Sequence, residues 1–127
     1  MGIYAIGVDI LEADRIRDAI DRHPGFIKRI YTENEIKYCE SKLKTRYLHY
    51  AARFAAKEAV AKALGVGIGV VGWKDIEILR DSAHKPILQL QGNAEKYAKE
   101  LNLNHWSISL SHTHTYAIAM AAALSEA

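Results

Sequence analysis

The sequence predicts an α+β fold: a small single domain in which an antiparallel sheet packs against one long central helix. Segments with helical spacing fall mostly in the first half of the chain, and β-rich runs fall mostly in the second half. Helices followed by strands favour an α+β arrangement over repeated βαβ units. A length of 127 residues suits one hydrophobic core, so we expect residues 1–127 to form one domain.

The chain is expected to begin with a strand and a helix. Ile3–Ile10 is rich in β-branched residues and has the length of a buried strand. Glu12–Arg22 alternates charges around a narrow apolar stripe at helical spacing. Pro24 and Gly25 should end this helix, because proline disfavours a helical residue before it.

Two further helical segments should follow. Phe26–Tyr31 is expected to form one or two turns. Thr32 and Glu35 have the spacing of a capping box, which predicts the start of another helix that runs towards Ser41.

Lys44–Leu64 is the longest predicted helix, and Gly65 is expected to close it as a left-handed cap. Small side chains recur at every fourth position of this helix, at Ala51, Ala55, Ala59 and Ala63. Such a row lets another backbone approach closely.

The second half should hold two strand pairs separated by a helix. The expected segments are a hairpin of Trp73–Leu79 and Pro86–Gln91, a helix over Gly92–Leu101, and strands over Trp106–Ser111 and Tyr116–Ala123.

Composition bounds the possible partners. The net charge of +2 predicts no general attraction to nucleic acid. Cys39 is the only cysteine, so an internal disulfide is excluded, and a reducing, cytoplasmic location is expected. The apolar run near the carboxyl terminus is much shorter than the roughly 20 residues of a membrane span, so no membrane association is expected.

The long helix also concentrates charge. Residues 41–74 carry seven lysines and arginines but one carboxylate, Glu58. Glu58 and Lys62 are four residues apart and share a face. One interpretation is a solvated ion pair worth about 0.3–0.5 kcal/mol. The other is a phosphate site, in which the carboxylate holds a metal ion and the lysine neutralises charge.

Asp9 is a second candidate ligand. It comes late in an apolar strand, where a charge is costly unless it is paired or bound to metal. Aspartate is also a favoured helix cap, and a helix follows directly. The residues alone leave both interpretations open.

Glycines at positions 65, 67 and 69 do not form a dinucleotide fingerprint, because they follow a helix and precede a strand. His112 and His114 could lie on one strand face as metal ligands, but no third ligand accompanies them.

Two motifs together resemble a known family. The segment Gly7–Ile10 with Arg15 and Ile16, followed by Arg53–Lys62, resembles holo-[acyl-carrier-protein] synthase, the short single-domain class of 4'-phosphopantetheinyl transferases. The resemblance spans nearly the whole chain. It implies transfer of 4'-phosphopantetheine from coenzyme A to a serine hydroxyl of apo-acyl carrier protein, which releases adenosine 3',5'-bisphosphate and supports fatty acid biosynthesis.

The resemblance also implies roles for the central residues. Asp9 and Glu58 would bind Mg²⁺, and magnesium is often held by one or two carboxylates plus substrate phosphates. Lys62 would stabilise or protonate the leaving side. Either Glu58 or a metal-bound water would take the serine proton.

Other residues are matched to coenzyme A by the same resemblance. His105, His112 and Thr113 correspond to a looser third motif that contacts the nucleotide half, although a strand histidine often only packs locally. Arg53 would bind a phosphate, Gly65 would lie beside the pantetheine, and Pro86 near the adenine.

Basic residues of the first helices are candidates for the acidic carrier protein, namely Arg15, Arg22 and Arg29, although such charges can simply be solvated. The resemblance implies a homotrimer with active sites at subunit interfaces. Two rival functions remain: a metal-dependent phosphohydrolase that uses the same carboxylates, and a binding module whose charged helix is only surface.

Overall fold

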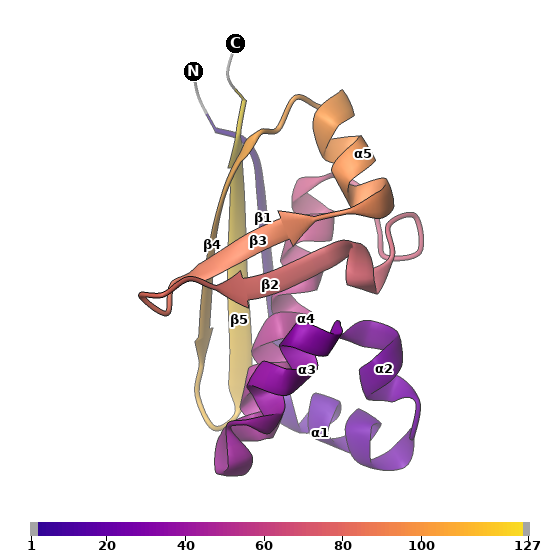
Figure 1. Cartoon of the computed structure of the whole chain (residues 1–127), viewed down its shortest axis with the longest axis vertical. Coiled ribbons are helices and arrows are strands. Elements are labelled where there is room, and N and C mark those ends of the chain that lie inside the picture. The colour runs from indigo at the N-terminus through magenta and orange to yellow at the C-terminus, as the bar shows by residue number, and fades with distance from the viewer. Residues whose placement is uncertain (1–2, 126–127) are drawn as a thin grey trace.

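The computed structural model describes residues 3–125. A three-stranded antiparallel sheet has the order β1-β5-β4, and β2 and β3 form a separate antiparallel hairpin (Figure 1). The strands are β1 Ile3–Glu12, β2 Ile76–Arg80, β3 Pro86–Leu90, β4 His105–His112 and β5 Tyr116–Leu124. The helices are α1 Ala13–Arg22, α2 Phe26–Ile30, α3 Glu33–Glu40, α4 Arg46–Ala63 and α5 Gly92–Glu100, with 3₁₀ turns at Leu43–Thr45 (η1) and Trp73–Asp75 (η2).

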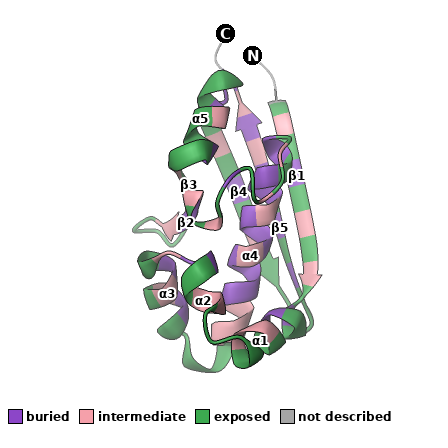
Figure 2. Ribbon diagram, turned by 90° about the vertical axis from the view of Figure 1, so that its right-hand side faces the viewer, coloured by how far each residue is buried: buried purple, intermediate pink, exposed green. Residues whose placement is uncertain are grey.

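Helix α4 is the centre of the molecule. It packs on one face of the three-stranded sheet, while the hairpin and α3 cover its other side (Figures 1 and 2). The inward positions of β5 are all alanines, and the predicted alanine row of α4 is buried against the sheet. Small residues on both surfaces let the helix and the sheet approach closely.

Gly7 marks the closest approach of β1 to α4. A Cβ atom at Gly7 would lie 1.8 Å from the carbonyl oxygen of Ala59. Only glycine therefore fits at this contact. The contact fixes β1 on the helix two residues before Asp9 and one residue from Glu58, so it sets how the two predicted metal ligands face each other.

A buried ion pair joins α3, α4 and β2. Lys57 Nζ lies 2.8 Å from Glu35 Oε1, and both side chains are fully buried. Lys57 also donates to the carbonyls of Trp73 and Ile76, and the second Glu35 oxygen accepts from the backbone N–H of Ile78. Glu35 also completes the predicted capping box with Thr32. Such a pair is tolerated in a core because every polar atom has a partner.

On the far face of the three-stranded sheet, β1 and β5 present an exposed apolar surface, here called the outer sheet face, whereas the outward positions of β4 are polar and include three exposed serines, Ser107, Ser109 and Ser111. The large side chains of the outer sheet face are Tyr4, Ile6, Val8, Ile10, Tyr116, Ile118 and Met120, each at least 40% exposed. A contiguous apolar surface of this kind marks an interaction site.

The observed elements follow the predicted order, with three differences. The long helix begins at Arg46, because Lys44 and Thr45 belong to the 3₁₀ turn η1. The first strand runs on to Glu12, because it stays paired with β5 as far as Tyr116. Trp73–Asp75 forms a 3₁₀ turn in place of the start of a strand, because the Asp75 side chain accepts the Gly72 N–H at 2.9 Å. Within residues 3–125, none of the helices has the length and apolar character needed to span a membrane.

Candidate active site

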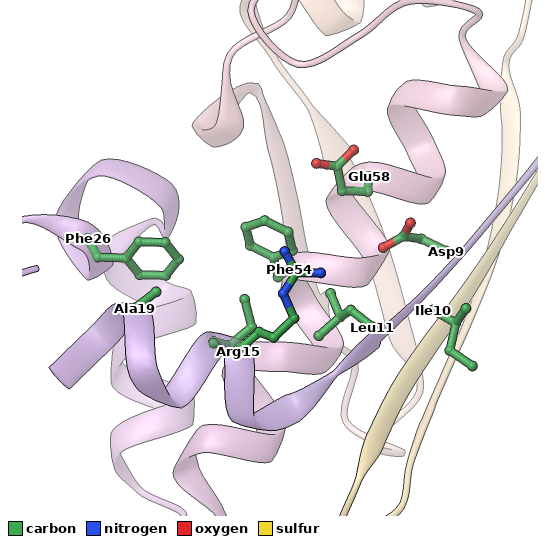
Figure 3. A pocket seen from close by; sticks show the side chains of 9 residues that line it. Asp9, Ile10, Leu11, Arg15, Ala19, Phe26, Phe54 and Glu58 are labelled. Atoms are coloured by element: carbon green, nitrogen blue, oxygen red, sulfur yellow. The ribbon is translucent and has the colours of Figure 1, made fainter. Parts of the chain in front are cut away.

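A cavity of about 460 Å³ lies where β1, α1 and α4 meet (Figure 3). Asp9 and Glu58 form its polar end, and Arg15 reaches into it from α1. The other end is apolar. Its walls are Leu11, Ile16, Ala19, Phe26 and Phe54.

Asp9 lies inside β1, in register with Ala119 of β5. It does not cap α1: the cap residue is Glu12, whose side chain makes no capping hydrogen bond. The helix-cap interpretation of Asp9 is therefore wrong. Its carboxylate instead accepts from Lys62 Nζ at 3.1 Å, and it is mostly shielded from solvent.

Lys62 extends from α4 to β1. Its ammonium donates to the carbonyl of Val8 at 3.0 Å as well as to Asp9. The alternative of a surface pair with Glu58 is wrong, because the lysine forms its ion pair with Asp9. It therefore lies beside both carboxylates of the cavity and remains half exposed.

Glu58 has an altered titration. Burial raises the pKa of its carboxyl group, the negative charge of Asp9 raises it further, and Lys62 lowers it. Two carboxylates close enough to repel each other favour a cation between them. Burial and a neighbouring like charge are also typical of functional carboxylates.

This donor set fits Mg²⁺. Hard oxygen ligands from two carboxylates are a usual protein contribution, and waters and substrate phosphates complete the octahedron. Among residues 3–125 there is no cluster of three or more carboxylate, histidine or cysteine side chains that would suit a closed metal cage. An open site with two carboxylates leaves room on the metal ion for the phosphate oxygens of a substrate.

Arg53 lies elsewhere. Residues five apart on an α-helix are separated by about 140° around its axis, so Arg53 and Glu58 face opposite sides of α4. The Arg53 side chain is 1% exposed and its guanidinium stacks over the ring of Tyr38 at 4.2 Å. Arg80 and Lys42 lie over the same ring at 4.9 and 5.0 Å.

Two histidines complete this second group. The ring of His49, on α4, meets the rings of Tyr38 at 5.5 Å and of His112 at 5.4 Å. We call the whole group the cationic cluster. Its members are Tyr38, Lys42, His49, Arg53, Arg80 and His112.

The predicted coenzyme A contacts are partly brought together. Thr113 follows His112 in the β4–β5 turn, and Pro86 is the register partner of Arg80. His105 lies at the other end of β4, roughly 23 Å from His112 at 3.3 Å per residue. One chain therefore does not unite the two histidines.

The remaining predicted residues lie near the carboxylate cavity or on the surface. Gly65 ends α4 with φ of +76°, which confirms the predicted left-handed cap. Arg15 lines the cavity, whereas Arg22 and Arg29 are exposed on α1 and α2.

Sequence reasoning missed Tyr38, His49 and Arg80. Arg80 was expected in a hairpin turn, but it ends β2 with a buried Nε. A signal was available only for His49, which is four residues before Arg53 and so shares its helix face.

Comparison with known proteins decides the family. The family model described as the 4'-phosphopantetheinyl transferase superfamily matches residues 5–121. The chain belongs to this superfamily. A relative of this transferase from Alkaliphilus oremlandii, named holo-[acyl-carrier-protein] synthase, is 47% identical over 96% of this chain and 99% of its own.

Two further proteins are similar over nearly their full length. A holo-[acyl-carrier-protein] synthase from Chlamydia caviae is 50% identical over 94% of this chain and 95% of its own. A solved structure of the Bacillus anthracis synthase in complex with CoA (3',5'-ADP) has a TM-score of 0.81 at 36% identity, covering 98% of each chain. These similarities confirm the predicted family, the α+β fold and the class of enzyme, a phosphopantetheinyl transferase.

Proposed function

We propose that this transferase moves 4'-phosphopantetheine from coenzyme A to a serine hydroxyl of apo-acyl carrier protein in a Mg²⁺-dependent reaction. The observation that carries the proposal is the cavity between β1 and α4, where Asp9, Glu58 and Lys62 converge. A family relative whose structure is described with coenzyme A supports the choice of donor.

The charge of each residue suits it to a different role. Asp9 and Glu58 would hold Mg²⁺, which when bound neutralises charge on the pyrophosphate. Lys62 lies 3.1 Å from Asp9 and is suited to neutralise charge on the leaving side. Either Glu58 or a water of the site would accept the serine proton. Most of the catalysis would be positioning and charge neutralisation.

The cationic cluster is the proposed site for the nucleotide end of coenzyme A. Arg53, Arg80 and His112 supply positive charge or hydrogen-bond donors. Pro86 pairs with Arg80 across the hairpin, and Thr113 directly follows His112. Gly65, at the end of α4, leaves room for the pantetheine arm because it has no side chain. His105 would have to act from another copy or not at all.

These positions support a site that is shared between copies. The carboxylate cavity and the cationic cluster lie on opposite sides of α4, so one coenzyme A molecule bridges them most simply between neighbouring chains. Two different surfaces that meet head to tail make a heterologous interface, which forms a ring when the rotation between copies closes. The outer sheet face supplies apolar area for this contact. We therefore propose a homotrimer with active sites at subunit interfaces.

The carrier protein is proposed to bind over α1 and α2. Arg15 lines the cavity, and Arg22 and Arg29 are exposed on the same helices. Complementary charge would speed and orient the encounter with an acidic carrier. The cytoplasmic location, the role in fatty acid biosynthesis and the single domain over residues 1–127 stay predictions.

The test is the intact mass of an apo-acyl carrier protein after incubation with the enzyme and coenzyme A. We expect the mass of one phosphopantetheine group to be added with Mg²⁺ and not with EDTA. Consumption of coenzyme A without carrier protein would instead favour a phosphohydrolase. No mass shift with several carrier proteins would overturn the proposal.

A further inference from the structure

The cationic cluster is a concentration of positive charge without counter-ions. Arg53 and Arg80 each have a buried Nε with no hydrogen-bond partner. Within residues 3–125, no carboxylate lies within 4 Å of the charged atoms of Arg53, Arg80 or Lys42. The guanidinium groups donate to backbone carbonyls, Arg53 to that of His49 and Arg80 to that of His84. Their positive charge is not balanced by a carboxylate of the described residues, so the cluster suits an anion from outside the chain.

His49 lies in the middle of this charge. Tyr38 comes from α3, Lys42 from the turn before η1, Arg53 from α4, Arg80 from β2 and His112 from β4. Burial of the imidazole, followed by the charges of Arg53, His112, Lys42 and Arg80, lowers the pKa of His49 to about 4. His49 is therefore neutral in the free protein at neutral pH.

We propose that His49 is a further ligand-binding residue, which gains a proton when the cationic cluster binds a phosphate monoester. The inference rests on the proposed function, because coenzyme A and its product adenosine 3',5'-bisphosphate carry such a group. A phosphate monoester has a charge of about −1.5 to −2 near neutral pH. That charge offsets the cations that keep His49 neutral, and a protonated imidazole donates from both ring nitrogens.

The proton comes from solvent, and no bond other than N–H is made. Because His49 binds more protons in the complex than in the free protein, affinity for the anion rises as the pH falls. The extra affinity is fully present below the free-state pKa of about 4 and is lost as pH rises through the higher value in the complex.

Calorimetric titration with adenosine 3',5'-bisphosphate measures this uptake directly. The heat of binding is compared at pH 6.5 in two buffers that differ in ionisation enthalpy, for the wild-type protein and for His49→Phe. Phenylalanine keeps the ring contacts with Tyr38 and His112 but cannot titrate. We expect the wild type to take up about half a proton more than His49→Phe, and its affinity to fall more steeply between pH 6 and pH 8.

Controls identify the group that takes up the proton. His23→Phe, at an exposed histidine after α1, should take up protons as the wild type does. If adenosine 5'-monophosphate binds without proton uptake, the 3'-phosphate is the group that the cluster binds. If inorganic phosphate binds with proton uptake, the phosphate group alone is sufficient. If His49→Phe does not fold by circular dichroism, His49→Gln replaces it.

Equal proton uptake in wild type and His49→Phe overturns the inference. If the bisphosphate binds and the carrier protein is modified without extra uptake, the inference fails and the proposed function stands. If neither binding nor carrier modification occurs, both fail.

Discussion

The surroundings of Glu58 disfavour its negative charge. Its carboxyl pKa is raised by burial and by Asp9, so folding favours the protonated form. A group whose pKa is raised on folding contributes stability that is present below its unfolded value, here 4.5, and is lost as pH rises through the folded value. At neutral pH the charged Glu58 therefore lowers the free energy of unfolding unless a cation is bound.

Glu58→Gln should separate stability from activity. Without Mg²⁺ at pH 7 we expect the variant to melt at a temperature equal to or above the wild type, with the two converging in acid below pH 4.5. Carrier modification should fall by at least about 100-fold, because the amide can neither complete the metal site nor accept a proton.

Scanning calorimetry with and without Mg²⁺ checks the stability, since a ligand that binds the folded state raises the melting temperature. The ion should stabilise the wild type and not Glu58→Gln. Glu100→Gln, at an exposed position of α5, is the control and should behave as wild type. A Glu58→Gln variant that keeps full turnover would remove this residue from the site.

The site residues that could be predicted from the sequence are those whose charge differs from that of their neighbours along the chain. Asp9 is a charge in an apolar strand and Glu58 is one acid among many bases, so each stands out from its neighbours along the chain. The hydrogen bond from Lys62 to Asp9 joins residues 53 positions apart, and no local pattern predicts it. Arg80 and Tyr38 were missed for the same reason, since only the packing of β2 and α3 around α4 brings them to Arg53.

At the scale of elements, periodicity predicted the type of each helix and strand because local spacing decides which face is buried. It could not predict Trp73–Asp75, where one side-chain hydrogen bond holds the expected start of a strand in a 3₁₀ turn. Nor could it tell that the strands form two sheets, because pairing partners are set by tertiary contacts. The alanine row of α4 was the one local pattern that anticipated a long-range contact, and Gly7 is what it contacts.

Gly7→Ala tests that contact. The new Cβ would lie 1.8 Å from the Ala59 carbonyl oxygen, so β1 must move away from α4. We expect a loss of about 1–3 kcal/mol or more in the free energy of unfolding, measured by urea denaturation. Because Asp9 moves with β1, Mg²⁺ should also stabilise the variant less than the wild type.

Gly25→Ala is the matched control. No atom lies within 4 Å of a Cβ built at Gly25, and its φ of −90° suits alanine. Alanine there should leave stability unchanged or raise it by about 0.4–1 kcal/mol. Equal effects of the two substitutions would show that the close approach of β1 to α4 is not what holds the site together.

At the scale of the whole molecule, two features independently favour binding of a second copy. One is the apolar outer sheet face, and the other is the separation of the carboxylate cavity from the cationic cluster. Met120 lies in the middle of that face and is 51% exposed in one chain. Met120→Glu places a charge in any interface built there, so we expect the proposed trimer to dissociate and carrier modification to be lost, while circular dichroism stays unchanged.

Light scattering measures the mass of the assembly. Leu101→Glu is the control, because Leu101 is equally exposed, at 48%, but lies at the end of α5 away from the outer sheet face. A monomeric mass for the wild type would contradict the homotrimer. A Met120→Glu variant that stays trimeric would move the interface to another surface.

Mixing two inactive variants tests whether a site is shared between copies. Glu58→Gln removes a ligand from the carboxylate cavity, and Arg53→Met removes a cation from the opposite side of α4. If each site takes its cavity from one chain and its cationic cluster from the next, co-expressed variants form some sites in which both halves are intact. Random assembly then gives about a quarter of wild-type activity, although each variant alone is inactive. A site contained within one chain gives no recovery, because every chain carries one of the two changes. Recovered carrier modification therefore requires that the two sides of α4 in one chain serve different active sites.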